Sequence, residues 1–142
     1  MQLNVQYSLI QRIKTVTGLN TLWLYDGITL PTTKPFVTVE QMPNISEQFA
    51  KGRVLRTYFH FQVCLYANSA SERAKLQDAV KNAIQFDPIA LYDAESTPDN
   101  VVGYFYADVT GETPVSPEDP SDKTNYHKVY LDVEVDEIIH KE

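Results

Sequence analysis

The sequence predicts an α+β domain in which an antiparallel, mixed-order sheet of about four strands carries two helices packed on one face, with long inter-strand loops. Three observations support this class. Residues 53–86 read as a long alternating strand that runs into a capped amphipathic helix. Other strand-like segments follow one another without helices between them, which is typical of antiparallel α+β proteins. The length, 142 residues, suits a single domain spanning residues 1–142.

The strand over residues 53–67 shows the clearest period-two pattern in the chain. Its core-facing series is apolar apart from one threonine: Leu55, Thr57, Phe59, Phe61, Val63 and Leu65. The opposite series is more polar: Val54, Arg56, Tyr58, His60, Gln62, Cys64 and Tyr66. Alternation of this length indicates a strand with one face on the core and the other partly in contact with water.

Two segments have helical periodicity. Residues 5–16 place Val5, Leu9, Ile13 and Val16 on one stripe, and Gly18 suits the end of a helix. The second helix starts at Ser69, which has the capping-box spacing to Glu72. It ends near Pro88, because the residue before a proline disfavours helical backbone.

The remaining segments are read as strands and loops. We expect a short strand over residues 21–25 and longer strands over residues 36–42, 101–110 and 125–139. Residues 43–52 and 111–124 are polar, and the second of these segments contains three prolines, so both are predicted to be loops. Residues 89–100 show no regular pattern.

Composition excludes several function classes. The net charge is −7 and the twelve lysines and arginines are scattered, so direct nucleic-acid recognition is not expected. No apolar run approaches the ~20 residues that span a bilayer. The N-terminal segment lacks the features of a signal peptide, so we expect no membrane partner. The lone cysteine, Cys64, cannot form an internal disulfide.

The sequence offers no catalytic constellation. It contains neither a G-x-S-x-G nucleophile motif nor a phosphate-binding glycine loop. His60 and Cys64 share a strand face, but four residues of strand span roughly 13 Å, too far for one zinc ion to bind both. We therefore expect no enzyme activity, no cofactor and no metal site.

Two surface features are candidates for function. Asp132, Glu134 and Asp136 are predicted to share one strand face. They form either a solvated face or a wall that faces a channel or a basic partner. Tyrosines also gather on the non-core series of the strands, which favours an oligomer interface or cross-strand stacking. They are Tyr58, Tyr66, Tyr104, Tyr106, Tyr126 and Tyr130.

Three segments together resemble the tail-terminator (tail-completion) proteins of long-tailed bacteriophages. They are the P-F-V-x-V strand at residues 35–39, the R-x-Y-x-F-x-V-x-L-Y-A strand at residues 56–67, and the S-x-x-E-x-x-x-L-x-D-A-V helix from Ser69. The resemblance covers most of the chain, but it is a pattern of element types without a catalytic signature. Neck and head-completion proteins of the same particles share similar patterns.

The resemblance implies a virion structural protein of the tail or neck, assembled in the host cytoplasm. Such a protein forms a homo-oligomeric ring, commonly a hexamer, that caps the tail tube, stops tube polymerisation and joins a head-completion or connector protein. DNA passes through the ring without sequence-specific binding, and Asp132, Glu134 and Asp136 are then candidates for the channel wall. The alternatives are a neck or head-completion protein and a dimeric α+β module that binds a ligand or peptide.

On this resemblance the segments 43–52 and 111–123 would be contact arms. Residues in and after the first of these segments are the candidates for the subunit interface: Phe49, Lys51, Arg53, Arg56 and Tyr58.

Overall fold

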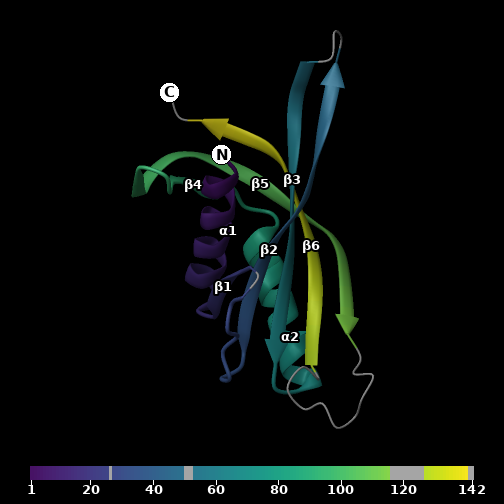
Figure 1. The fold of residues 1–142 in the computed structure, drawn as a ribbon. Coiled ribbons are helices and arrows are strands. Elements are labelled where there is room, and N and C mark those ends of the chain that lie inside the picture. Colours follow the sequence, from purple (N-terminus) through teal and green to yellow (C-terminus); the bar gives the residue numbers. More distant parts are fainter. Residues whose placement is uncertain (26, 50–52, 116–126, 141–142) are drawn as a thin grey trace.

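The computed structural model describes residues 1–25, 27–49, 53–115 and 127–140, and it describes only the backbone of residues 47–49, 53–56, 97–99 and 136–137. The helices are α1 (Gln2–Thr17) and α2 (Ala70–Ile84). The strands are β1 (Asn20–Leu24), β2 (Phe36–Phe49), β3 (Arg53–Ala67), β4 (Ile89–Asp93), β5 (Thr97–Val115) and β6 (His127–His140). Figure 1 shows them as one curled sheet with both helices on the same side.

The α+β class is correct, but the prediction of about four strands is wrong. The described residues form a six-stranded sheet in the order β1-β2-β3-β6-β5-β4. β1 pairs with β2 in parallel and the other neighbours are antiparallel, so the sheet is mixed. β4 was missed because its five residues, IALYD, are too few to show a period.

The predicted loops are also largely strand. β2 and β3 continue past the rest of the sheet as a long hairpin, so the loop prediction for residues 43–52 is wrong for residues 43–49. The register shifts between Met42 and Ile45, where Pro43 cannot donate a ladder hydrogen bond. Likewise β5 extends through Val115 into the second predicted loop. The rest of that loop, residues 116–124, lies outside the described residues.

The helix ends confirm the local signals in the sequence. α1 ends at Gly18, whose φ of 73° is the left-handed conformation that glycine adopts without strain. At the start of α2 the Glu72 backbone N–H donates to Ser69 Oγ, at 3.1 Å. The Glu72 carboxylate accepts from the backbone N–H of Asn68, at 2.8 Å, one residue earlier than in the standard capping box.

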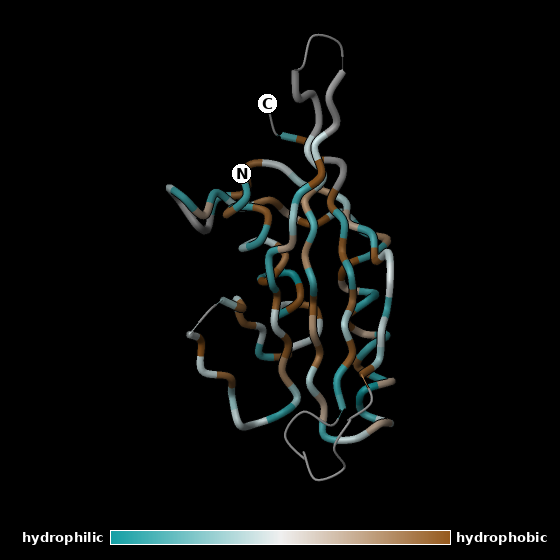
Figure 2. Tube along the Cα trace, turned by 45° about the vertical axis from the view of Figure 1, so that its right-hand side comes forward, coloured by the Kyte–Doolittle hydropathy of each residue, from teal (hydrophilic) through white to brown (hydrophobic). Residues whose placement is uncertain are grey.

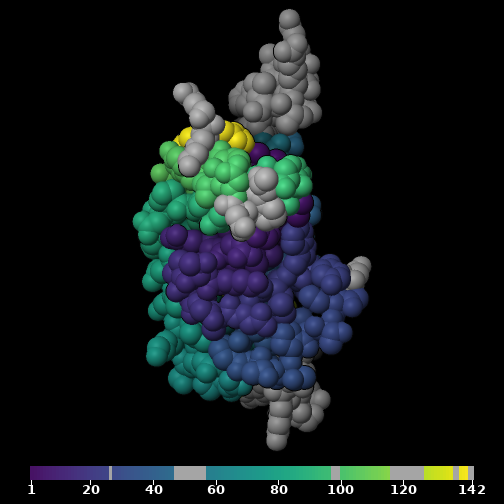
Figure 3. All heavy atoms as spheres, turned by 90° about the vertical axis from the view of Figure 1, so that its left-hand side faces the viewer, coloured from purple at the N-terminus to yellow at the C-terminus, as the bar shows by residue number. Residues whose placement is uncertain are grey.

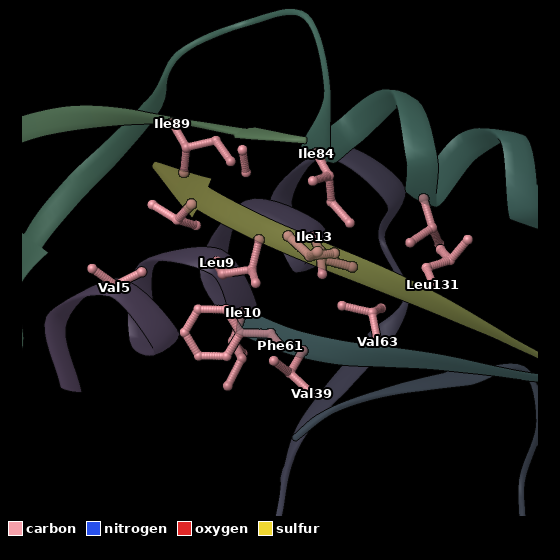
Figure 4. Packing of buried hydrophobic residues seen from close by; sticks show 14 of the residues in the cluster. Val5, Leu9, Ile10, Ile13, Val39, Phe61, Val63, Ile84, Ile89 and Leu131 are labelled. Carbon is pink, nitrogen blue, oxygen red and sulfur yellow. The ribbon is translucent and has the colours of Figure 1, made fainter. Parts of the chain in front are cut away.

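The main core lies between the helices and one face of the sheet. The alternating side chains of β3 and β6 meet α1 and α2 there, together with shorter contributions from β2, β4 and β5. Figure 4 shows several of these residues pointing toward one another. The fully buried members include Leu9, Ile13, Phe61, Val63, Ile84, Ile89 and Leu131.

Helix α1 lies in the concave side of the curled sheet and contacts strands at both of its edges, β1 and β4. In Figure 3 it occupies the middle of one face of the molecule. Polar side chains of α1 satisfy strand backbone groups. The Tyr92 N–H donates to Ser8 Oγ at 2.8 Å, and the Ala94 N–H donates to Asn4 Oδ1 at 3.0 Å. On β2, the carbonyl of Val39 accepts from Gln6 Nε2 at 3.2 Å.

Replacing Ser8 by Ala should therefore lower the free energy of unfolding by about 0.5–1.5 kcal/mol, because the Tyr92 N–H loses a hydrogen-bond partner that is itself fully buried. Urea denaturation followed by circular dichroism measures this change. Thr15→Ala, on the exposed side of the same helix, is the matched control and should change stability by less than about 0.5 kcal/mol. Equal effects for the two variants would contradict the role assigned to Ser8.

A second stability prediction concerns the close approach of β5 and β6 at Gly103. A Cβ at this position would overlap the backbone carbonyl oxygen of Ile139. Gly103→Ala should cost at least about 1–3 kcal/mol, because a backbone has to move to admit the methyl group. Gly111→Ala, on the same strand, meets only the movable carboxylate of Asp132 at 3.1 Å and should cost less than about 1 kcal/mol. A comparison of denaturation midpoints tests this difference, and a tolerated Gly103→Ala would disprove it.

Candidate functional site

The face of the sheet opposite the helices, which we call the open face, is the candidate functional surface. Its described side chains alternate with the core residues along the strands. In Figure 2, hydrophilic and hydrophobic colours accordingly change along the strands. They include Phe36, Thr38, Glu40, His60, Gln62, Cys64, Tyr66, Tyr104, Tyr106, Asp108, Lys128, Tyr130, Asp132 and Glu134.

One half of the open face is covered by the protein's own chain. Phe36, Cys64 and Tyr66 form a small second core, against which Leu22, Leu30 and Tyr130 pack. The rings of Phe36 and Tyr66 are stacked, with centroids 4.5 Å apart. The Lys128 ammonium lies 5.8 Å from the Tyr66 ring centre and 5.4 Å from that of Tyr130, a cation–π arrangement. This half is therefore a structural layer.

The single cysteine belongs to this layer. Burial raises the pKa of the Cys64 thiol to about 11, so the thiol is protonated at neutral pH. Burial likewise raises the pKa of Tyr66 above its ordinary value. A protonated, covered thiol is a poor nucleophile. The strand geometry thus gives Cys64 a packing role beside Phe36.

The other half of the open face carries a group of carboxylates, which we call the carboxylate patch: Glu40, Asp108, Asp132 and Glu134. Asp108 and Asp132 are exposed, while Glu40 and Glu134 are partly buried. Asp108 lies directly opposite Glu134 in the β5–β6 register, and like charges in that position repel each other. The strand register holds these carboxylates close together although they repel one another.

His60 offsets part of this repulsion. Its Nε2 lies 3.1 Å from Glu134 Oε2, and the two residues are cross-strand neighbours of β3 and β6. The other ring nitrogen, Nδ1, is buried and has no hydrogen-bond partner in the described part of the chain. Among the described residues, Glu134 is the one member of the patch with a cationic or titratable nitrogen within ion-pair distance. Asp108 and Asp132 are exposed and have no ion-pair partner among the residues that the structure describes.

Aromatic side chains border the carboxylate patch along β5. Tyr104 and Tyr106 are 37% and 36% exposed, and their rings meet edge-to-face with centroids 6.0 Å apart. Half-exposed tyrosines beside charged groups are typical of protein interfaces. This half of the open face therefore combines charge with exposed aromatic area, which suits contact with another macromolecule.

The predicted channel-wall residues fall in this region. Asp132 and Glu134 lie on the open face of β6 as expected from alternation. The pairing of β5 with β6 skips Asp136, because Tyr106 is opposite Glu137 and Ala107 is opposite Val135. Simple alternation therefore stops at Val135, and the side chain of Asp136 is not described. Whether these residues line a channel remains a prediction.

Most of the predicted interface residues belong to the extended part of the β2–β3 hairpin, which we call the arm (residues 43–49 and 53–58). Phe49 ends β2, and Arg53 and Arg56 begin β3, although their side chains are not described. Lys51 lies outside the described residues. Tyr58 is partly buried and pairs with Ile45 in the hairpin register. The arm and the carboxylate patch are thus separate surfaces, and their use as interfaces remains a prediction.

Sequence reasoning missed the arrangement across the strands. Alternation along β5 puts Asp108 on the same face as Tyr104 and Tyr106, but its position opposite Glu134 depends on the β5–β6 register, which shifts on both sides of this pair. The alternation of a single strand contains no signal for these shifts. The polar composition of residues 43–49 also concealed the arm, since its exposed edges need no apolar side chains.

The described residues offer little else for chemistry. They contain no group of three or more His, Cys, Asp or Glu placed to hold a metal ion. No helix in the described part of the chain is long and apolar enough to cross a membrane.

A hollow between α1 and β4 has a volume of only about 90 Å³, below the roughly 300–1,000 Å³ of typical small-molecule sites. A wider and more open hollow of about 530 Å³ lies at the start of α2, beside Leu19, Pro35 and Lys75.

The protonated state of Cys64 leads to a direct test. At pH 8 the thiol should react with iodoacetamide at least ~100-fold more slowly in the folded protein than in urea, because burial suppresses both access and thiolate formation. An Asp78→Cys variant in a Cys64→Ala background puts an exposed thiol in the middle of α2, and this control thiol should react at a similar rate in both states. Rapid labelling of folded wild-type protein would contradict the packing role.

Comparison with known proteins identifies the fold and no family. No family model matches the chain, and no curated protein matches it by sequence. Among solved structures, the chain is similar to one from the "Virion of native gene transfer agent (GTA) particle". The two are 10% identical, with a TM-score of 0.56, and the likeness covers 96% of this chain and 95% of the other. The chain therefore has the same fold, nearly end to end, as a protein of that particle.

Proposed function

We propose that the chain is a structural protein of a phage-like virion. The observation that carries this proposal is the likeness to a chain of a gene transfer agent virion, which extends over almost the whole of both chains. Fold alone does not determine function, so support must also come from the surfaces. The open face and the arm offer large surfaces for contact.

Within the virion, we propose the role of tail terminator, a ring that caps the tail tube and joins it to the head connector. The resemblance of residues 35–39, 56–67 and 69–84 to that family supports this role. A protein that binds only other subunits needs stable, rigid faces more than a catalytic cleft. In this chain the helices cover one face of the sheet and form the core, while half of the opposite face stays available for contact with another subunit.

The test combines a mass measurement with an assembly assay. Size-exclusion chromatography with light scattering should give a closed oligomer of fixed size, commonly a hexamer, when purified protein is mixed with the tail-tube protein of the same particle. In electron micrographs, added terminator should stop tube growth and give tubes with one blunt, capped end. Tubes that grow at an unchanged rate, beside a monomeric protein, would contradict the role.

A neck or head-completion protein is the second candidate, because the fold likeness applies to it equally. The same reagents separate the two roles. A head-completion protein should bind the portal end of DNA-filled heads and leave tube growth unchanged. A terminator should bind tubes first and bind heads only through the capped tube.

A further inference from the structure

Phe86 combines two features that a folded chain ordinarily avoids. It follows the C-cap residue of α2, and its φ of 79° makes it the one described non-glycine residue in the left-handed region. Glycine or asparagine is usual at such a position, because a bulky side chain is strained there. The Phe86 side chain is also 76% exposed. Strained residues gather at sites where the strain serves a function, so Phe86 is a candidate contact residue.

The turn that carries Phe86, residues 85–88, is anchored to α1 by Arg12. The Arg12 Nε donates to the backbone carbonyl of Ala83 at 2.9 Å, in the last turn of α2. The Arg12 Nη2 lies 4.0 Å from Asp87 Oδ2, the outer limit of an ion pair. On the other side of the turn, Ile89 is 1% exposed and belongs to the core. Because its backbone is held at both ends, Phe86 loses little conformational freedom when its ring is bound.

The hollow between α1 and β4 lies close to this turn. Val16 lines it from α1 and Ile89 lines it from β4. Ile89 follows Phe86 by three residues, so their Cα atoms are at most about 11 Å apart. The Phe86 ring does not fill this hollow of its own chain, since Phe86 is absent from the lining and is exposed. A closed cavity of about 150 Å³ holds benzene, so an open hollow of about 90 Å³ suits the insertion of one ring.

The turn and the hollow complement each other in chemistry. The turn presents the aromatic ring of Phe86 next to the carboxylate of Asp87, whose side chain is 75% exposed. The hollow is lined by the apolar side chains of Val16 and Ile89 and by the cationic Arg12, and no carboxylate is among its described lining residues. A guanidinium both stacks on aromatic rings and pairs with carboxylates. The hollow therefore offers the groups that a ring followed by a carboxylate contacts best.

We propose that two copies of the chain pair through this surface, with the Phe86 ring of each copy seated in the α1–β4 hollow of the other. Because the ring and the hollow are neighbours on one surface, a two-fold axis lets both copies make the same contact at once. The Asp87 carboxylate of each copy then lies beside the Arg12 guanidinium of the other. A two-fold contact ends at two copies, so it goes beyond the proposed function and is separate from the contacts that would close a ring.

Replacing Phe86 by Asn tests the contact and separates it from a structural role. Sedimentation velocity should show a reversible dimer for the wild type. Phe86→Asn should weaken that dimer about a thousandfold, which is about thirtyfold for each of the two symmetric contacts, as is typical of a buried aromatic anchor. At concentrations where both proteins are monomeric, the variant should keep or raise the urea midpoint, because asparagine adopts positive φ more readily than phenylalanine.

The matched control is Tyr25→Asn, which removes another exposed aromatic side chain, 61% exposed at the end of β1, and should leave the dimer unchanged. A purely structural role for Phe86 predicts the opposite pattern, with a lowered urea midpoint and an unchanged association constant.

Mixing two complementary variants gives the sharpest result. Val16→Glu puts a carboxylate in the hollow, one helical turn from Arg12, where it repels Asp87 of the other copy. Phe86→Asn keeps the hollow and Val16→Glu keeps the ring, so neither variant should dimerise alone. An equimolar mixture should form a mixed dimer that retains one of the two contacts and is about thirtyfold weaker than the wild-type dimer. Native mass spectrometry identifies the mixed dimer by its mass, and circular dichroism checks that each variant is folded.

Several outcomes would overturn the inference while leaving the proposed function intact. A wild type that stays monomeric by itself would exclude the dimer, and an oligomer that neither variant changes would place its contact elsewhere. A mixture that stays monomeric beside a dimeric wild type would show that the ring does not enter this hollow. The tube-capping assay judges the proposed function separately in each case.

Discussion

The structure depends on the burial of α1 in the curl of the sheet. The helix contributes the fully buried side chains of Leu9 and Ile13 to the core. Its Ser8 and Asn4 side chains accept hydrogen bonds from backbone N–H groups in β4 and directly after it. A helix that contacts both sheet edges fixes the curvature between them. It also gives partners to N–H groups of an edge strand that would otherwise face water or another chain. The hydrophobic and hydrogen-bonding requirements of the fold are thus met by one element.

Because both helices cover the same face, the opposite face has to be managed without them. One half is covered by the local chain, where the ring of Phe36 stacks on that of Tyr66 beneath the Lys128 ammonium. The other half keeps its carboxylates and tyrosines in contact with water. This division explains how one strand, β6, carries both a structural residue, Tyr130, and the outward charge of Asp132. The uncovered half and the arm are the two places where a sheet face or a strand edge has no partner among the described residues.

The parts of the fold that the sequence predicted are those with local signals. Alternation predicted β3, the Ser69–Glu72 spacing predicted the start of α2, and Gly18 predicted the end of α1. The missed parts depend on contacts distant in sequence. β4 is a strand because Ile89 and Leu91 pair with β5, and residues 43–49 are strand although Pro43 is typical of a loop. For the candidate site, alternation placed Asp132 and Glu134 together, but only the β5–β6 register brings Asp108 opposite Glu134.

The way in which the arm joins the body affects how it responds to force. It is continuous with β2 and β3, and each of these strands is paired on its other side along the body, with β1 and β6 respectively. Tension applied along the arm therefore runs parallel to those ladders and loads their hydrogen bonds in shear, so that many bonds must break together. A hairpin attached through a flexible loop would instead yield one bond at a time. The way in which the arm is attached therefore resists tension along its length.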